Sequence, residues 1–369
     1  MKILVTADAV GGVWQYATDL ARGLSGLGHE IVLAVTGPSP SAAAAKAASS
    51  IKGLTLVDTG LPLEWLAESA VSVQRAGEAV ARLAERHGVD VIHLNAPALA
   101  AGVTFGRPVV AVAHSCVATW WSAVKRDALC DTFGWRAELS GRGLAAADVA
   151  IAPTNAFAEA TQKAHGLKQR PLTVYNGRAA QALPKLAQHD CAFTAGRLWD
   201  EGKNVATLDR ATAKLAVPLY AAGPEQGPNG ASIDLQHARA LGNLNEKELG
   251  RWLASRPVFA SAALYEPFGL AVLEAAAAGC ALVLSDIPTF RELWHGVAAF
   301  VDPMDADAFA ETIGLVVGDD FARAEMGKRA QQRAARFTVD AMARKMASIY
   351  RDLAQHPHAA QPNRSMAAA

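Results

Sequence analysis

The stretch "YEPFGLAVLEAAAAGC", residues 265–280, joins a tight turn to an apolar helix and carries two carboxylates. Pro267 and Gly269 permit the turn, so a helix is predicted to begin near Gly269. The first N–H groups of a helix have no intrahelical acceptor, and a glycine lets a phosphate come close to the backbone. The stretch therefore predicts an anion-binding site at the start of this helix.

The two glutamates of the stretch have different surroundings. Glu274 lies one helical turn after Leu270 and shares its face, where a carboxylate can accept hydrogen bonds from two vicinal hydroxyls, as on a ribose. Glu266 precedes the helix and would lie nearer the far end of a ligand. Alternatively, Glu274 is a solvated helix residue and Glu266 a partner of the helix dipole. The small apolar residues around Glu274 argue against an exposed face.

A second segment, "TAGRLWDEGKNVATL" at residues 194–208, supplies positive charge. Arg197 is expected to end a strand and Lys203 to open the next helix. A diphosphate needs its charge neutralised, and a guanidinium can bind two oxygens together. A lysine at a helix start opposes the helix dipole, which favours a bound anion over local stabilisation. Solvated loop charges are the alternative.

Short β-branched runs alternate with helical patterns along the chain, which is typical of parallel sheets covered by helices. The predicted strands are 2–6, 30–35, 54–58, 90–94, 108–113, 149–153 and 172–176, then 191–196, 218–223, 257–262, 281–286 and 298–303. The alternation breaks at 177–190, which is interpreted as a linker. The pattern predicts an α/β protein with two Rossmann-like halves. An amphipathic helix is predicted over 339–355, followed by a frayed tail.

Composition narrows the class of protein. The chain has 369 residues, is 51% hydrophobic, and balances 35 Lys and Arg against 35 Asp and Glu, so its net charge gives no sign of a nucleic-acid partner. Its four cysteines are far apart, which argues against a zinc site and favours a reducing cytoplasm. No apolar run reaches the roughly 18 residues of a membrane span, and the N-terminus reads as a strand rather than a signal peptide.

Together, "GRLWDEGKN" (196–204) and "EPFGLAVLE" (266–274) resemble the signature of the retaining family-4 glycosyltransferases of GT-B fold. The combination is specific, and the resemblance extends over almost the whole chain. It implies two Rossmann-like domains with parallel sheets facing across a deep cleft. Residues 1–180 would bind the acceptor, together with a terminal helix at 339–357 that crosses back to this domain. Residues 190–336 would bind a nucleotide-sugar donor.

The resemblance also implies roles for single residues in the second domain. Arg197 and Lys203 would hold the diphosphate of the donor. Phe268, Gly269 and Leu270 would line the same site, the last two through their backbone N–H groups.

By the same resemblance, Glu274 would bind the ribose hydroxyls and Glu266 those of the transferred sugar. Gly11 and Gly12, in "AVGGVW", would meet the donor phosphates from the first domain. His114, at the end of "PVVAVAHS", would lie near the transferred sugar. Many relatives have aspartate after this histidine and this chain has serine, so no acid/base role is carried over from that position.

The expected function is transfer of a hexosyl group from a nucleotide-diphosphate sugar to a hydroxyl of a glycan, glycolipid or small molecule, in polysaccharide or glycoconjugate biosynthesis. Glu266, His114, Arg197 and Lys203 form the expected catalytic set. No metal or other cofactor is expected, because the D-x-D in "DADAF" (305–309) reads as a helix cap. The alternatives are a GT-B sugar-nucleotide epimerase, a donor hydrolase, a catalytically silent nucleotide-binding relative, and an oxidoreductase. The missing G-x-G-x-x-G disfavours the last.

Residues 116–144 lie in the expected acceptor domain and carry Trp120, Trp121 and Trp135. Their basic neighbours are Lys125, Arg126, Arg136 and Arg142. The aromatic rings could stack on a sugar or anchor the protein at the inner face of a membrane. A partly buried helix with a solvated face is the third alternative. The expected partners are thus a nucleotide sugar and a sugar or lipid-linked acceptor, for a cytoplasmic protein with optional peripheral membrane contact.

Overall fold

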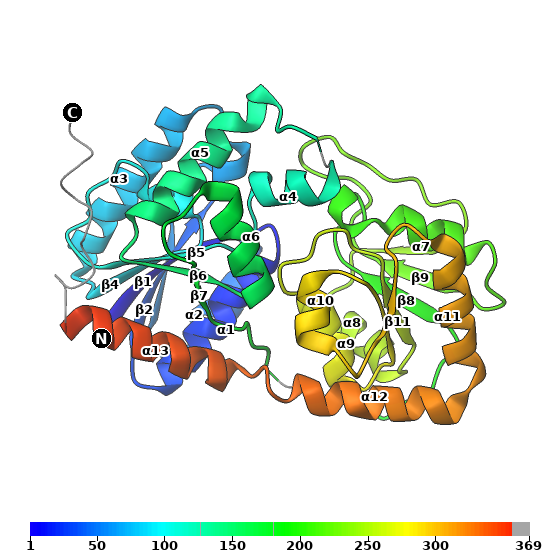
Figure 1. Cartoon of the computed structure of the whole chain (residues 1–369). Helices are drawn as coiled ribbons and strands as arrows, with labels where there is room; N and C mark the ends of the chain where they lie inside the picture. The colour runs from blue at the N-terminus through cyan, green and yellow to red at the C-terminus, as the bar shows by residue number, and fades with distance from the viewer. Residues whose placement is uncertain (126, 180, 356–369) are drawn as a thin grey trace. The chain divides into compact units, whose positions relative to one another are not determined.

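The computed structural model describes residues 1–125, 127–179 and 181–355, and these form two compact units (Figure 1). Unit 1 comprises Met1–Ser122, Asp127–Gly177 and the segment from Val339 onward. Unit 2 comprises Arg178–Thr338 and a short segment that starts at Ala123. Each unit is built around one sheet.

Unit 1 contains a parallel sheet of seven strands in the order β3-β2-β1-β4-β5-β6-β7. All seven strands predicted in this half are confirmed. The strands are β1 (Lys2–Asp8), β2 (Glu30–Thr36), β3 (Leu54–Asp58), β4 (Val91–Leu94), β5 (Val109–Val112), β6 (Val149–Ala152) and β7 (Leu172–Thr173). The last is shorter than predicted, because this edge strand pairs with β6 over only two residues.

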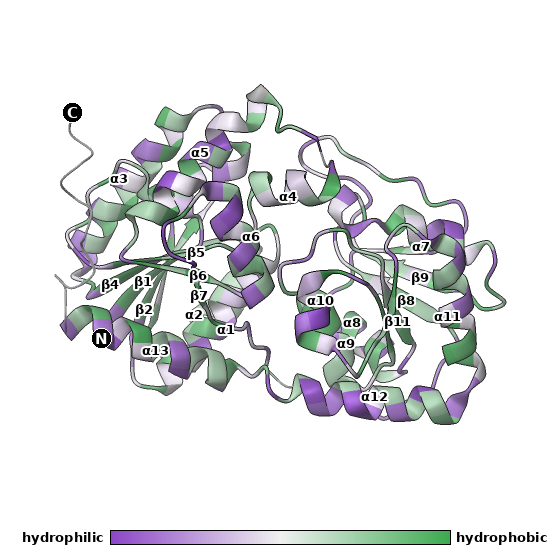
Figure 2. Cartoon of the chain, viewed as in Figure 1, coloured by the Kyte–Doolittle hydropathy of each residue, from purple (hydrophilic) through white to green (hydrophobic). Residues whose placement is uncertain are grey.

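The helices of the first half lie between these strands. They are α1 (Gly12–Gly26), α2 (Ala42–Ser49), η1 (Glu64–Leu66), α3 (Ala70–His87), η2 (Pro97–Ala100), α4 (Val117–Val124), α5 (Asp131–Ala146) and α6 (Asn155–His165). In β1, Ile3 and Val5 face a core that includes α1, whereas Leu4 faces a second core that includes α3. Both faces of the sheet are therefore covered, as the apolar runs predict, and the strands are mostly green in Figure 2.

Unit 2 contains a parallel sheet of six strands in the order β10-β9-β8-β11-β12-β13. Its strands are β8 (Ala192–Ala195), β9 (Leu219–Ala222), β10 (Arg239–Gly242), β11 (Val258–Ser261), β12 (Leu282–Ser285) and β13 (Ala299–Val301). Five of these are as predicted. The sixth, β10, was not predicted, because it is a largely exposed edge strand without β-branched residues.

The helices of unit 2 alternate with its strands. They are η3 (Glu201–Lys203), α7 (Val205–Thr212), α8 (Glu246–Ala254), α9 (Leu270–Ala277), α10 (Pro288–Trp294), α11 (Ala306–Gly318) and α12 (Asp320–Ala334). The carboxylate of Asp305 accepts a hydrogen bond from Ala308 N–H at 2.9 Å, which confirms the expected helix cap in "DADAF". Both units are α/β and Rossmann-like.

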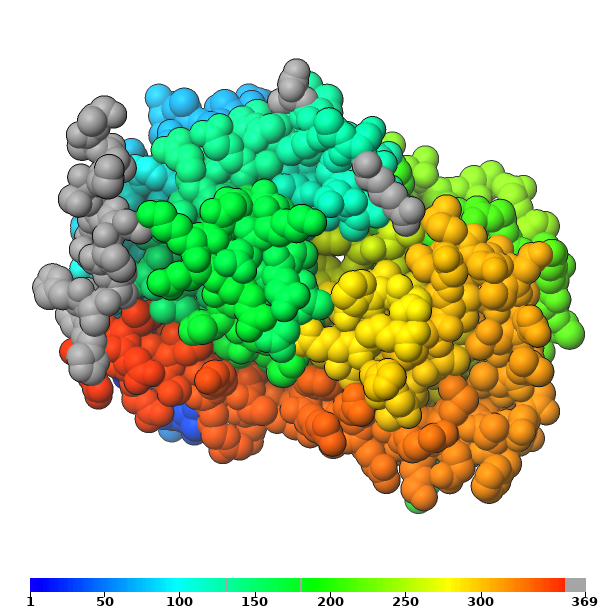
Figure 3. Space-filling view, viewed as in Figure 1, coloured from blue at the N-terminus to red at the C-terminus, as the bar shows by residue number. Residues whose placement is uncertain are grey.

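The terminal helix α13 (Val339–Gln355) belongs to unit 1, where it packs on α1. Met346 and Tyr350 are fully buried on its inner face, while its outer side lies at the surface of unit 1 (red in Figure 3). The amphipathic pattern thus identifies this helix and its buried face. The expected end of the helix at 357 and the expected frayed tail lie outside the described residues.

The predicted linker, 177–190, contains no helix or strand among its described residues. Its one regular feature is a parallel bridge between Arg178 and Thr338, where the chain enters and leaves unit 2. Residue 180 lies outside the described part. Among all described residues, no helix combines the length and the apolar character that crossing a membrane requires.

The contact between α1 and α13 can be tested at Gly23. A Cβ added there would lie 2.6 Å from Ala343 Cβ and 2.9 Å from Val339 Cγ1. Gly23→Ala is therefore expected to destabilise the protein by about 1–3 kcal/mol through overpacking. Gly26, on the same helix, has no heavy atom within 4 Å of an added Cβ.

Gly26→Ala is the matched control, and it should stabilise the protein by about 0.5 kcal/mol through helix propensity. Urea unfolding of the two variants measures the difference. Equal stability of the two variants would contradict the close packing of α1 on α13.

Candidate active site

The start of α9 depends on the backbone conformation of Gly269. This residue caps the helix with φ +88°, in the left-handed region. An added Cβ would also lie 3.1 Å from Phe290 and 3.3 Å from Glu266 Cγ. The first hydrogen bond of the helix runs from Leu273 N–H to the Gly269 carbonyl at 3.0 Å. The preceding N–H groups therefore lie at the positive end of the helix, where the sequence predicts an anion site.

Beside this helix start, Lys203 and Glu266 form an ion pair. Lys203 Nζ donates to Glu266 Oε2 at 2.5 Å, and the two side chains are 22% and 17% exposed. Two predicted site residues from segments more than 60 positions apart are thereby brought together. A ligand at this point meets an ammonium and a carboxylate side by side.

The loop that carries Lys203 is fixed by hydrogen bonds. Asp200 accepts from Gly202 N–H at 2.9 Å, and the Gly202 carbonyl accepts from the N–H groups of Leu264 and Tyr265 at 2.9 and 3.1 Å. Lys203 does not open a helix as predicted, since it ends η3 two residues before α7. It consequently needs no anion to offset the dipole of α7, and the case for a phosphate contact rests on its place beside α9.

Arg197 lies two residues beyond the end of β8 rather than at the end of the strand. Its side chain is 46% exposed and its guanidinium donates to Asp200 at 2.7 Å. The carboxylate of Asp200 thus holds both Arg197 and the Gly202 turn. The sequence analysis missed these contacts of Asp200, although the residue stands inside the quoted motif.

Glu274 is 18% exposed in its side chain, which confirms that it is not a solvated helix residue. Its Oε1 accepts from Arg178 at 2.7 Å, and the Arg178 side chain is only 9% exposed. This partner was not predicted, because the two residues are 96 positions apart and Arg178 lies in the apparent linker. Phe268 is buried with its ring against Phe337 at 5.7 Å, so a role in binding falls to its backbone.

Three predicted site residues belong to unit 1 and form a separate set. Gly11 caps α1 and Gly12 is its first residue, and both are exposed. His114 follows β5 by two residues and is half-buried. The ring of Tyr16, from α1, packs edge-on against His114 with centroids 4.4 Å apart. One helix therefore connects the glycine turn to the histidine.

A chain of hydrogen bonds fixes the tautomer of His114. The amide oxygen of Asn95 accepts from Nε2 of His114 at 2.8 Å and from Nε2 of His93 at 2.9 Å, while Asn95 Nδ2 donates to the Thr6 carbonyl at 2.6 Å. Nδ1 of His93 accepts from the Tyr350 hydroxyl at 2.6 Å. Because an amide oxygen only accepts, both imidazoles carry their proton on Nε2, and His114 Nδ1 is an acceptor.

Burial keeps these groups uncharged. Desolvation lowers the pKa of His93 to about 4, against the smaller effect of the Asn95 hydrogen bond. Desolvation, with a smaller contribution from His93, holds the pKa of His114 well below its usual value. Burial raises the pKa of Tyr350 well above its ordinary value, so it stays a hydroxyl donor. His114 can thus accept a hydrogen bond from a hydroxyl but is a poor cation for a phosphate.

Comparison with known families matches the chain in two adjoining parts. The model described as "Glycosyltransferase Family 4" matches residues 10–180, and the one described as "Glycosyl transferases group 1" matches residues 190–319. The chain belongs to the family-4 glycosyltransferases.

Two characterised relatives share part of their length with this family-4 chain. D-inositol 3-phosphate glycosyltransferase of Corynebacterium urealyticum is 32% identical over 150 residues, which is 36% of this chain and 35% of the relative. Phosphatidyl-myo-inositol mannosyltransferase of Mycolicibacterium smegmatis is 30% identical over 166 residues, or 42% and 43% of the two chains. The chain thus spans less than half the length of each curated relative it matches.

Solved structures match over nearly the whole chain and show the GT-B fold. HepE of Anabaena, in complex with UDP-glucose, gives a TM-score of 0.74 at 20% identity and covers 96% of this chain and 100% of its own. Sucrose-phosphate synthase of Thermosynechococcus elongatus gives 0.74 at 18% identity, covering 96% and 99%. The predicted fold class is confirmed.

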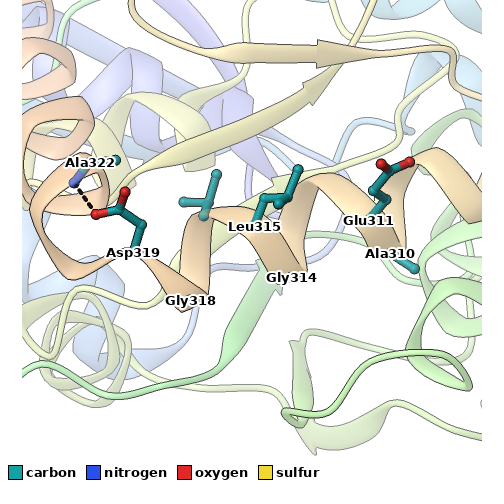
Figure 4. A pocket seen from close by; sticks show the side chains of 8 residues that line it. Ala310, Glu311, Gly314, Leu315, Gly318, Asp319 and Ala322 are labelled. Carbon is teal, nitrogen blue, oxygen red and sulfur yellow. Dashed lines mark hydrogen bonds between the residues drawn. The ribbon is translucent and has the colours of Figure 1, made fainter.

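Other features of this family-4 chain lie apart from the predicted site residues. A surface hollow on α11 and the start of α12 includes Leu315 and Asp319 (Figure 4). Trp120, Trp121 and Trp135 are each half-buried, so they form no exposed aromatic set. Arg126 lies outside the described residues. Among those described, no three His, Cys, Asp or Glu side chains gather in an arrangement suited to a metal ion.

The buried histidine pair predicts a pH dependence of stability. His93 takes up a proton near pH 6.5 when unfolded but only near 4 when folded, so the unfolded state binds more protons between these values. The contribution of His93 to the unfolding free energy should therefore fall by about 3 kcal/mol as pH drops from 6.5 to 4. Hydrogen exchange of the β4 amides measures it. His93→Gln should flatten the slope, and an unchanged slope would contradict the assignment.

Proposed function

We propose that this chain is a retaining glycosyltransferase that moves a hexosyl group from a nucleotide-diphosphate sugar to an acceptor hydroxyl. The observation that carries the proposal is the Lys203–Glu266 pair beside the start of α9. It combines a cation and helix N–H groups for a diphosphate with a carboxylate for sugar hydroxyls. The family membership and the UDP-glucose named with HepE support the same donor class.

The proposed donor roles all belong to residues of unit 2. Lys203, Arg197 and the N–H groups at Gly269 and Leu270 bind the diphosphate. Glu266 orients the transferred sugar, and Glu274 binds the ribose. These groups stabilise the negative charge that develops on the leaving phosphate.

The reaction proceeds at the front face of the sugar. The bond from the anomeric carbon to the phosphate oxygen breaks, and the bond to the acceptor oxygen forms on the same face. The acceptor proton passes to the leaving phosphate oxygen. Neutral His114 accepts a hydrogen bond from a sugar hydroxyl, and the backbone of Gly11 and Gly12 meets the phosphates.

Metal independence is part of the proposal. It rests on the two basic side chains and the helix start, which supply the charge that a divalent cation supplies elsewhere. Activity that disappears on chelation and returns with added Mg²⁺ would overturn it.

The acceptor is a glycan, a glycolipid or a small molecule with a free hydroxyl. The names of the two relatives make inositol phosphates and phosphatidylinositol the first acceptors to assay. We place the protein in the cytoplasm, with or without peripheral contact at the inner face of a membrane. A liposome pull-down distinguishes these locations.

An epimerase or donor hydrolase is the alternative, and it would release products without any acceptor. A silent relative would bind the donor without turnover. Thermal-shift screening of UDP-, GDP- and ADP-sugars, followed by a transfer assay, separates the three. A donor that binds the native state raises the melting temperature, and a retained anomeric product that requires acceptor supports the proposal.

The basic residues give the sharpest mutational test. Lys203→Ala should lower kcat/KM by a factor equivalent to about 3–4 kcal/mol of transition-state stabilisation, since it removes a charge-assisted contact to phosphate. Arg197→Ala should lower it by the equivalent of about 2 kcal/mol, because the Arg197 side chain is more exposed. Lys214→Ala is the control, because Lys214 pairs with Asp307 on the exposed surface. Folding is followed by melting temperature. Wild-type turnover in a folded Lys203→Ala enzyme would refute the assignment.

A further inference from the structure

Arg178 is the first residue of the long segment of unit 2. Its guanidinium contacts α9, the helix at whose start the donor is proposed to bind. Nη2 donates to Glu274 Oε1 at 2.7 Å and lies 4.0 Å from Oε1 of Glu246. The Arg178 side chain is 9% exposed, whereas that of Glu246 is 72% exposed. The short contact with a sheltered carboxylate is therefore the dominant one.

The backbone of Arg178 is also fixed next to the site. Its N–H donates to the Phe337 carbonyl at 3.1 Å, beside the bridge to Thr338. The ring of Phe337 packs edge-on against Phe268, one residue before the cap of α9. The segments joined by the Arg178–Thr338 bridge thus contact α9 in two places. The ion pair reaches the middle of α9, and the aromatic contact lies next to its start.

We propose that Arg178 is a positioning residue that sets the Glu274 carboxylate for the two ribose hydroxyls of the donor nucleotide. The inference rests on the proposed function. A carboxylate offers about four acceptor positions, and a guanidinium only donates. The contact from Arg178 occupies one of these positions on Oε1, so it does not by itself prevent the 2′- and 3′-hydroxyls from donating to the same carboxylate.

The advantage of this arrangement is preorganisation. A glutamate side chain loses rotamer freedom when it binds a ligand, and that cost lowers affinity. The bond to Arg178 restricts Glu274 before the ligand arrives. It also balances the charge of a carboxylate that the nucleotide would cover on binding. Arg178 consequently affects recognition of the ribose more than recognition of the phosphates.

Isothermal calorimetry with UDP, GDP and ADP, and with their 2′-deoxy and 3′-deoxy forms, tests this role. For the best-bound base, the wild-type protein should prefer the ribonucleotide over each deoxy form by about tenfold, the value of one good hydrogen bond. Arg178→Met should weaken binding of the ribonucleotide by about tenfold. The ratio of its affinity for the ribonucleotide to its affinity for each deoxy form should then be close to one. Arg178→Lys, which keeps the charge, should restore part of the ratio.

Arg323→Met is the matched control. Arg323 is 2% exposed in its side chain and pairs with Asp190 and Asp320 at 2.7 and 2.8 Å, in the same unit but outside the site. Its loss should lower the melting temperature and leave the ribose-to-deoxyribose ratio unchanged.

Different results would overturn the role of Arg178 and the proposed function. If a folded Arg178→Met variant keeps the full ratio, the pair is only structural and this inference is wrong while the proposed function stands. If Arg178→Met does not fold, an Arg178→Lys variant with a lowered melting temperature and an unchanged ratio leads to the same conclusion. If the wild-type protein binds none of the nucleotides, both are overturned.

Discussion

The candidate site depends on the backbone of Gly269, whose left-handed conformation lets the chain turn directly into α9. A Cβ added to this residue would lie 3.1 Å from Phe290 and 3.3 Å from Glu266 Cγ, so these side chains would have to shift slightly. The turn places the start of α9 only a few residues after Glu266, which pairs with Lys203. A helix start, a cation and a carboxylate thus share one small region, and a diphosphate joined to a sugar needs all three.

Both acidic residues of the motif are held by a basic partner, Glu266 by Lys203 and Glu274 by Arg178. A half-buried carboxylate without such a partner would lose solvation energy without compensation. The two pairs differ in what a donor would do to them. A phosphate competes with Glu266 for the Lys203 ammonium, whereas ribose hydroxyls donate to Glu274 and leave its bond to Arg178 in place.

Sequence patterns predicted most of the fold, because buried parallel strands leave continuous apolar runs and α13 has a clear amphipathic stripe. They missed β10, an exposed edge strand without that pattern. They singled out Glu266 and Glu274 as candidates from their spacing around the start of one helix. They could not identify the roles of Arg178, Asn95 or Tyr350, because those depend on contacts between distant segments, such as the bond between Tyr350 and His93. The position of Lys203 at the end of η3 depends on the Asp200 turn, which local spacing did not reveal.

The central claim is that a nucleoside diphosphate binds unit 2 at the start of α9. A crystal structure of the protein with its best-bound nucleoside diphosphate tests it most directly. We predict phosphate oxygens within hydrogen-bonding distance of the Gly269 or Leu270 N–H and of Lys203 Nζ, with the ribose at Glu274. A nucleotide bound elsewhere, with Lys203 and Glu266 still paired and α9 untouched, would contradict it.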